Sequence, residues 1–582
     1  MAVRVAGPLR QRGRGSAAPG RRARRPLLLL AVAAACVALC CCYVRVSATL
    51  PAGSDGASNA LEAWDLLHGN VLLRGWTLTD VSFYTTELPE YAAVELARGL
   101  TPDVLHVAAA LTYTLLVVLA GLLARGKARG REGWGRALIA AGVLIAPQLG
   151  NGVQVLLAQP DHVGTQVLIL GILLLLERAP RRWYTPAALW GLLTVAIVAD
   201  KITIVDAVVP LAFAGLVHAV WTRRPFAHRF ELSLAVAAGA AVATALPLLT
   251  LITRVGGFTL LPVQTGLSAP PGVPGHLSLA WHGILSLFGA EVTTAPSGPR
   301  TVLAWLHAPG IALAVAAFAV VAWRVPNQRD LVGDVLAVGI VVNLAGFVAS
   351  VIPATPFDTR EIAALLPFGA VLAGRVFGPW LAGPRLTRPA QPTTQPTRTA
   401  RVRPGVAALA AAGACQLAAL GYGSIQPAAA DPEQALAGWL AVHHLTSGLG
   451  TFTEGNLTTL DSGGTVRLLT ASWLPPARPG TPPADPRTDG AAEFHRPGGA
   501  VPRLYQSSAS WYDPRTRYAN FVVSGTADGS ADLIPRADIL ALAGPPAATY
   551  QFRSFTIMVW NTNLLALLGT PPSRLPGNIG RP

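Results

Sequence analysis

The sequence predicts an α-helical polytopic membrane protein with about eleven transmembrane helices and a small C-terminal α/β domain outside the membrane. Only 13% of its 582 residues are charged and 52% are apolar, and the mean hydropathy is +0.45. Soluble proteins carry about 25% charged residues. Apolar runs that approach the length of a bilayer recur along the chain, and arginines gather in every second loop between them.

About 20 apolar residues are needed for a helix to cross the hydrocarbon core of a bilayer. Two of the candidate runs, 164–176 and 185–199, are shorter than this. The predicted spans are 27–48, 104–124, 137–156, 164–176, 185–199, 202–221, 230–253, 302–323, 331–352, 361–379 and 405–424. They define a membrane domain, 27–424, between a basic tail, 1–26, and a C-terminal domain, 425–582.

The arginines predict the orientation of these spans, because basic loops remain in the cytoplasm. The basic segments are the tail 1–26 and the loops 125–136, 177–183, 221–229, 323–330 and 378–404. The alternate loops are poor in arginine or acidic; they are 49–103, 157–163, 200–201, 254–301 and 353–360. We therefore expect a plasma (inner) membrane protein with a cytoplasmic N-terminus and an external C-terminal domain.

The net charge of +15 does not indicate a nucleic-acid partner, because the arginines lie in short loops between apolar runs. Residues 380–404, rich in Pro, Thr and Arg, predict a cytoplasmic linker between the last two spans. The domain after residue 425 contains no cysteine, so disulfides cannot stabilise it. Its pattern predicts a helix at 432–449, strands at 465–472, 518–524 and 552–560, and a Pro-rich loop at 475–488.

The first expected outer loop, 49–103, holds the most informative polar stretch. A helix is predicted to begin at Thr86 or Glu87, with Pro89 in its first turn, and to end at Gly99. We expect this helix to lie along the membrane interface. Asp80, a few residues before this helix, would then lie close to the membrane surface.

Apolar surroundings raise the pKa of a carboxylate and make it a better base. Asp80, Glu87 and Glu90 are therefore candidate site residues, and Tyr84 is placed at the depth of the lipid headgroups. The alternative is that these acids form only the solvated edge of an exported loop.

Arg360 is expected at the outer start of the span 361–379. A helix N-terminus combined with a guanidinium group suits a phosphate. The alternative is a local ion pair of Arg360 with Asp358 or Glu361 that only caps the helix.

Two further outer turns carry charged residues. Asp161 and His162 follow a run that contains Asn151 and Gln154, which suggests a polar cleft. One His and one Asp are too few for a metal centre, so we predict substrate contacts or loop packing; no metal site is evident, and a divalent metal stays open. Lys201 with Asp200 forms either a self-paired hairpin tip or part of the same cleft.

The layout and two motifs resemble the polytopic glycosyltransferases of the GT-C fold, which include protein O-mannosyltransferases and aminoarabinose transferases. Asp80 with Glu87 resembles the acids of that family's first outer loop, although the family's adjacent Asp-Glu pair is absent. Residues 360–367, Arg-Glu-Ile-Ala-Ala-Leu-Leu-Pro, resemble its late arginine motif, with Glu361 where tyrosine is usual.

The resemblance implies an inverting enzyme that transfers a sugar from a polyprenyl-phosphate donor, with Asp80 as the general base. Arg360 would stabilise the leaving phosphate, aided by Lys201 or His162. The implied partners are the lipid-linked donor and membrane lipids, and the acceptor is unknown. The alternatives are a transporter or flippase and a non-catalytic assembly protein of the cell envelope. The assembly reading expects Asp80 and Arg360 to lie far apart.

Overall fold

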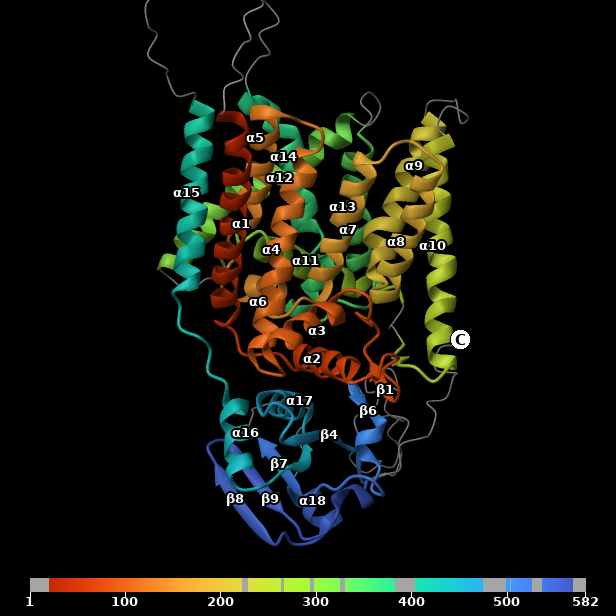
Figure 1. Cartoon of the computed structure of the whole chain (residues 1–582), viewed down its shortest axis with the longest axis vertical. Helices are drawn as coiled ribbons and strands as arrows, with labels where there is room; N and C mark the ends of the chain where they lie inside the picture. The colour runs from red at the N-terminus through yellow and green to blue at the C-terminus, as the bar shows by residue number, and fades with distance from the viewer. Residues whose placement is uncertain are drawn as a thin grey trace, which may run out of the picture.

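The computed structural model describes residues 20–221, 229–262, 266–293, 298–324, 330–382, 404–474, 499–502, 504–525 and 536–568. Most of the predicted basic tail, most of the linker 380–404 and the Pro-rich loop 475–488 lie outside these ranges. The described chain forms a helical bundle with a sheet-containing domain at one end (Figure 1).

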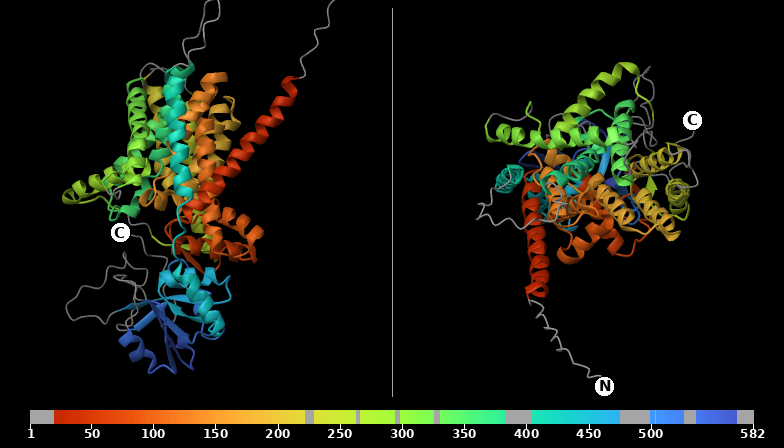
Figure 2. Two further views of the ribbon diagram at one scale, coloured as in Figure 1. Left: turned by 90° about the vertical axis from the view of Figure 1, so that its left-hand side faces the viewer. Right: turned by 90° about the horizontal axis from the view of Figure 1, so that it is seen from above.

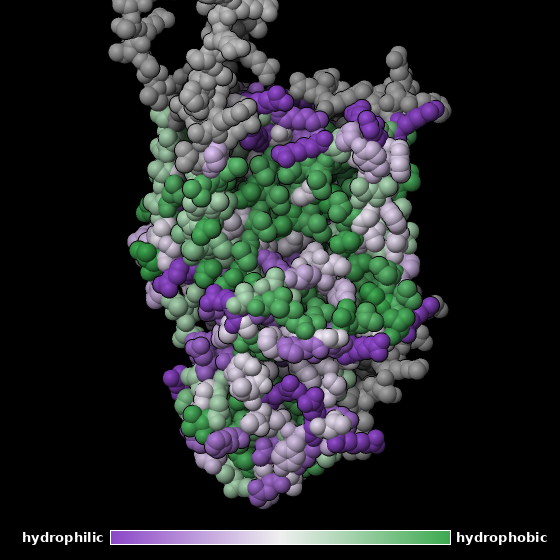
Figure 3. Space-filling model, viewed as in Figure 1, coloured by the Kyte–Doolittle hydropathy of each residue, from purple (hydrophilic) through white to green (hydrophobic). Residues whose placement is uncertain are grey.

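Each predicted span contains a helix that runs along the long axis of the bundle (Figure 1). These helices are α1 (Gly20–Ser47), α4 (Asp103–Arg125), α5 (Gly130–Leu144), α7 (Asp161–Arg178), α8 (Tyr184–Ala199), α9 (Val209–Trp221), α10 (Arg229–Arg254), α12 (Pro299–Arg324), α13 (Leu331–Ala349), α14 (Leu365–Ala382) and α15 (Pro404–Ser424). Helix α1 leans away from the rest of the bundle in Figure 2. A broad apolar band covers the visible flank, and charged residues collect at its upper end (Figure 3).

The apolar helices indicate a membrane protein. Among the described residues, five helices are long and apolar enough to cross a bilayer, or up to seven if each of two bent helix pairs forms one span. The number of eleven spans and their orientation therefore stay predictions. Side chains such as Leu29 and Val236, about 70% exposed, are consistent with contact with lipid.

The prediction of one continuous helix over 137–156 is wrong. Helix α5 ends at Leu144, and the short helix α6 (Asn151–Leu157) follows after a break that contains Pro147. Proline removes a backbone donor and disfavours helical geometry at the preceding residue, which explains the break. Helices α6 and α7 then form a pair bent by 60°.

Two helices lie across the end of the bundle, between it and the sheet domain (Figure 1). They are α2 (Ser54–Leu67) and α3 (Glu87–Arg98). The predicted helix at this position is confirmed, with Thr86 as its N-cap residue and Gly99, at φ 74°, ending it. Helix α3 buries one face, including Leu88 and Tyr91.

The sheet domain contains α16 (Pro432–Val442), α17 (Phe452–Asp461), α18 (Arg536–Ala543) and a six-stranded sheet of order β5-β4-β3-β7-β9-β8. The strands are β3 (Ser447–Gly450), β4 (Arg467–Leu474), β5 (Gly499–Pro502), β7 (Phe521–Gly525), β8 (Ala548–Phe552) and β9 (Phe555–Val559). Strand β3 runs parallel to β4 and β7, and the other pairs are antiparallel.

Alternate residues of the sheet enter two separate cores, as the two-residue period of a strand requires. Phe521 and Ile557 pack with α16 on one face, and Val522 and Met558 pack with α18 on the other. Two sequence predictions are corrected here. The helix expected over 432–449 ends at Val442 and gives way to β3, and the strand expected over 552–560 is part of the β8–β9 hairpin, which turns at Arg553 with φ 51°.

A second, three-stranded sheet joins the bundle to the sheet domain. Its central strand β1 (Trp76–Leu78) pairs in parallel with β2 (Thr259–Leu260) and antiparallel with β6 (Ser507–Ser508). Trp76 is buried and packs edge-on against Trp511 of the domain, with ring centroids 4.9 Å apart. The loop after β1, which contains Asp80, is thus held from both sides.

Candidate functional site

Charged side chains from five separate segments meet at the end of the bundle that faces the sheet domain. The segments are α2, the loop after β1, the first turn of α7, the turn between α8 and the π-helix η1 (Ile204–Val208), and the 3-10 turn η4 (Pro356–Ile362). We call these residues the site cluster: Asp55, Asp80, Asp161, His162, Asp200, Lys201, Arg360 and Glu361.

His162 lies at the centre of the site cluster. Its Nδ1 atom is 2.7 Å from Asp200 Oδ2, and its Nε2 atom is 3.2 Å from Glu361 Oε1. The hydroxyl of Thr165 also donates to Asp200, at 2.8 Å. An imidazole can donate to two carboxylates at once only as its cation, so this arrangement can hold a proton between α7, the α8–η1 turn and η4.

Arg360 is surrounded by acids. Its Nη1 atom lies 3.2 Å from Asp161 Oδ2 and 3.7 Å from Asp55 Oδ2, while Nε lies 3.9 Å from Glu361 Oε1. The guanidinium also stacks over Phe357, 4.5 Å from the ring centroid. These contacts fix the guanidinium plane, as a group that binds a phosphate must be fixed.

The turn η4 is held by its own cap, which separates Asp358 from Arg360. The Asp358 carboxylate accepts hydrogen bonds from the backbone amides of Ala354 and Thr355, at 2.8 and 2.6 Å, and from the Thr355 hydroxyl. Asp358 thus closes a capping box. Arg360 reaches Asp161, on a helix 199 positions earlier in the chain, in addition to its local contact with Glu361. The expected pair with Asp358 does not form, and Arg360 does more than cap its own turn.

Asp161 adopts backbone geometry that is uncommon for a residue with a side chain. Its φ is 42°, in the left-handed region that costs non-glycine residues roughly 1–3 kcal/mol. The residue follows Pro160, at the point where α6 gives way to α7. The strained turn directs Asp161 and His162 into the site cluster together.

Asp80 and Lys201 complete the site cluster. The Nζ atom of Lys201 donates to the backbone carbonyl of Asp80 at 3.2 Å, while Asp200 binds His162. Asp200 and Lys201, in the turn between α8 and η1, therefore belong to the site cluster and do not form an isolated hairpin tip. Burial raises the pKa of Asp80, reinforced by Glu361 and Asp200 and opposed by His162 and Lys201. Burial likewise lowers the pKa of Lys201, against the pull of Asp80 and Asp200.

Three other candidates from the sequence lie outside the site cluster. Glu87 is buried behind it, hydrogen-bonded to the Thr86 hydroxyl and packed against Gly164 of α7. Burial raises the pKa of Glu87 well above its ordinary value, which favours its neutral form.

Glu90 and Tyr84 point to other parts of the fold. The Glu90 carboxylate accepts a hydrogen bond from Thr112 of α4 at 2.5 Å, and burial raises its pKa to about 7. The Tyr84 hydroxyl donates to the carbonyl of Val71, and its ring packs on Phe258 with centroids 5.2 Å apart. Glu90 thus connects α3 to α4, and Tyr84 packs the loop before α3 against neighbouring loops.

The sequence did not single out Asp55 and Tyr505. Asp55 lies in the first turn of α2, where a Ser-Asp pair is a helix-start signal but gives no hint of a partner 305 positions later. Tyr505 belongs to the sheet domain and interacts electrostatically with Arg360. The domain thus approaches the site cluster directly.

Carboxylates outnumber cations in the site cluster, with five acids against Lys201, Arg360 and His162. An anionic substrate therefore needs both Lys201 and Arg360, and its charge favours the protonated form of the neighbouring acids. Within the described ranges, no three His, Cys, Asp or Glu side chains are arranged to hold a metal ion. The arrangement offers a carboxylate of raised basicity beside a fixed guanidinium and an ammonium group.

Neither a family model nor a curated protein matches this sequence. Among solved structures, ArnT from Cupriavidus metallidurans bound to undecaprenyl phosphate aligns over 94% of this chain and 99% of its own, at 13% identity and a TM-score of 0.49. The oligosaccharyltransferase of Archaeoglobus fulgidus in complex with Zn and sulfate aligns over 83% and 67%, at 13% identity and a TM-score of 0.42. Both are GT-C glycosyltransferases. At these values the alignments establish neither a family nor an activity for this chain.

Proposed function

We propose that the chain is a membrane glycosyltransferase that moves a sugar from a polyprenyl-phosphate donor to an acceptor hydroxyl, with inversion at the anomeric carbon. The reaction takes place at the end of the bundle that carries the sheet domain, the side that the arginine pattern predicts to be external. The substrate class is what the resemblance of residues 80–87 and 360–367 to the motifs of GT-C glycosyltransferases implies.

One observation supports this proposal above all others: Glu361 lies 3.9 Å from the Arg360 guanidinium, and its charge also helps to raise the pKa of Asp80. A base and a phosphate-binding cation can act on one substrate only if they face the same space. The assembly alternative expects Asp80 and Arg360 to lie far apart, so a shared neighbour in Glu361 favours an enzyme over that alternative.

The chemistry follows from the placement of the charges. The acceptor hydroxyl gives its proton to the Asp80 carboxylate while its oxygen forms a bond to the anomeric carbon. The bond from that carbon to the phosphate oxygen breaks on the opposite face, and the electron pair leaves with the phosphate. Arg360 and Lys201 stabilise the charge that develops there, which is commonly the larger contribution to catalysis.

The position of the site cluster suits a donor with a lipid tail. Helices α2 and α3 lie crosswise beside it, and apolar bundle helices continue above it (Figures 1 and 3). A polyprenyl tail can remain in the bilayer while its phosphate reaches the bundle end. A lipid-linked donor needs an apolar surface for its tail beside charged groups for its phosphate. The bundle helices and the site cluster offer these two side by side.

The decisive experiment is a transfer assay on the purified full chain in detergent, with a panel of polyprenyl-phosphate sugars and mass-spectrometric detection of released polyprenyl phosphate. We expect turnover with one donor, and loss of at least about 100-fold in the Arg360→Gln variant. Added EDTA, in a parallel arm, measures dependence on divalent cations. No turnover with any donor, from protein that binds these lipids, would refute the proposal.

A transporter is the second candidate, favoured by the two bent helix pairs. The pairs α6–α7 and η4–α14 are bent by 60° and 48°. Charged residues lie beside the breaks: Asp161 and His162 in the first turn of α7, and Arg360 and Glu361 in η4. Broken helices with charged ends are typical of transport sites. Movement of a lipid-linked sugar across proteoliposomes without any transfer product would favour this function over the enzyme.

A further inference from the structure

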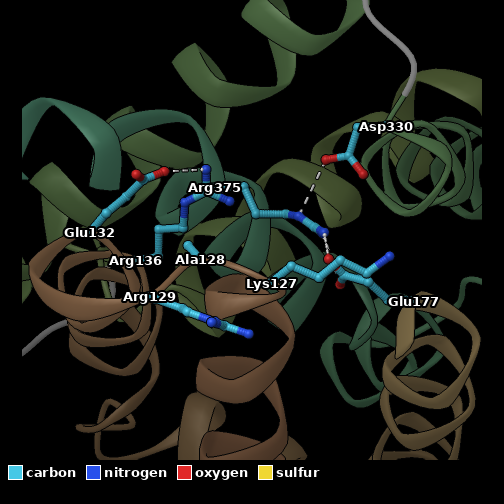
Figure 4. A pocket seen from close by; sticks show the side chains of 8 residues that line it. All are labelled: Lys127, Ala128, Arg129, Glu132, Arg136, Glu177, Asp330 and Arg375. Atoms are coloured by element: carbon cyan, nitrogen blue, oxygen red, sulfur yellow. Dashed lines mark hydrogen bonds and ion pairs between the residues drawn. The ribbon is translucent and has the colours of Figure 1, made fainter. Parts of the chain in front are cut away.

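A cavity of about 570 Å³ lies at the end of the bundle opposite to the site cluster (Figure 4). Eight residues line it: Lys127, Ala128, Arg129, Glu132, Arg136, Glu177, Asp330 and Arg375. They come from the α4–α5 connection, the first half of α5, the last turn of α7, the residue before α13, and α14. The proposed transfer reaction uses none of them.

The acids of this cavity are all paired with two of its arginines. Arg375, only 8% exposed, lies 2.8 Å from Glu177 Oε1 and 3.3 Å from Asp330 Oδ2. Arg136 pairs with Glu132 at 2.8 Å. Dashed lines in Figure 4 mark these three pairs among the residues that line the cavity.

Lys127 and Arg129 are the cations that remain. Both are exposed, and neither forms an ion pair with an acid in the part of the chain that the structure describes. The lining therefore carries a net charge of +1, and its surplus of positive charge is concentrated on the two side chains of the α4–α5 connection.

The packing of the bundle creates this concentration of charge. Helix α14 brings Gly374 and Gly378 directly against the backbone of Arg136, where any Cβ atom would collide. Gly126, at φ 53°, ends α4 and leaves room for the Glu177 carboxylate. The close approach of α5 and α14 places two guanidinium groups in one cavity, whereas arginines that only set orientation need no such enclosure.

We propose that this cavity binds a phosphate group. Its volume lies within the roughly 300–1,000 Å³ of small-molecule sites, and arginine and lysine side chains are the usual ligands of phosphate oxygens. The phosphate can belong to the headgroup of an anionic phospholipid in the adjacent leaflet or to a soluble phosphate monoester. Both sources present the same chemistry to Lys127 and Arg129.

The test is a binding measurement on the purified full chain that requires no transfer activity. The probes are glycerol phosphate, followed by thermal shift, and phosphatidylglycerol or phosphatidylcholine, followed by native mass spectrometry. The test protein is the double variant Lys127→Gln/Arg129→Gln. The matched control is Arg131→Gln, which removes an exposed arginine from the first turn of α5 that does not line the cavity.

We expect the wild-type chain to bind phosphatidylglycerol more tightly than phosphatidylcholine, or to bind glycerol phosphate, and the double variant to lose affinity by about tenfold or more. Retention of the lipid alone identifies a headgroup site, and binding of glycerol phosphate identifies a soluble ligand. The proposal is overturned if no phosphate probe binds, or if Arg131→Gln weakens binding as much as the double variant.

Discussion

Replacing Asp80 by Asn separates the chemical role of this carboxylate from any structural role. The substitution keeps the size and shape of the side chain, and the hydrogen bond from Lys201 goes to the backbone carbonyl, which is unchanged. Asp80→Asn removes one negative charge that Glu361 and Asp200 repel. We therefore expect the fold to tolerate the change.

The expected loss of transfer is about 10²–10⁴-fold, the usual contribution of a general base. This equals roughly 3–5 kcal/mol in the activation free energy. Stability should respond in the opposite direction. Burial raises the pKa of Asp80, so its ionised form destabilises the folded state. This destabilisation is complete above the folded-state pKa and absent below the unfolded-state pKa. The variant should be as stable as wild type at pH 8, or more stable.

The assay pairs the initial rate of donor cleavage with the thermal midpoint of the same protein at pH 8. The wild-type rate should also fall as the pH drops through the raised pKa of Asp80, so its acid limb lies above the ordinary range of an aspartate. Asp103→Asn, which alters an exposed acid paired with Arg98 at the same end of the bundle, is the control. Full activity in Asp80→Asn, or lost activity accompanied by unfolding, would refute the assignment.

Three further predictions concern charge and packing. Arg360→Gln should lower stability by about 1–3 kcal/mol, because Asp161 and Asp55 lose their cation in a partly buried site, and Arg360→Lys should lower it less. Burial raises the pKa of Glu95 to about 9, so the thermal midpoint of the wild type should include a component that falls between about pH 4.5 and pH 9, and Glu95→Gln should remove it. Gly374→Ala should cost about 1–3 kcal/mol, because its Cβ atom meets the Arg136 carbonyl.

Each of these variants has a comparison that can contradict it. Equal midpoints for wild type and Arg360→Gln would show that the acids do not depend on the guanidinium. Identical pH profiles for wild type and Glu95→Gln would remove the basis for the shifted pKa. Gly171→Ala on α7 adds a methyl group to open space, so a loss equal to that of Gly374→Ala would contradict the packing argument.

Local signals in the sequence predicted much of the fold. Helix α3 is an example, because Thr86, Pro89 and Gly99 act within the helix that they begin and end. The membrane helices are likewise predicted by a local property, the apolar composition of each segment. The break before α6 was missed because a long apolar run masks a proline such as Pro147, whose effect depends on neighbouring helices that satisfy the freed backbone groups.

The site could be predicted only in part. Arg360 and Asp161 were recognisable as charges beside apolar runs, but their ion pair spans 199 positions of sequence. Asp55 and Tyr505 reach Arg360 through the packing of α2 and the sheet domain, and no local pattern encodes that packing. The cavity around Arg375 escaped notice because arginine at this end of a bundle is expected for orientation alone.

The small sheet that joins bundle and domain has a consequence for biosynthesis. Strand β1 leaves the ribosome early, yet its partner β6 is made about 430 residues later, a delay of roughly 20–90 s at usual elongation rates. During that interval the segment with Asp80 lacks one flanking partner. A nascent or truncated chain that ends before β6 would therefore hold the loop with Asp80 from one side only, and the three-stranded sheet is complete only after Ser508 has been made.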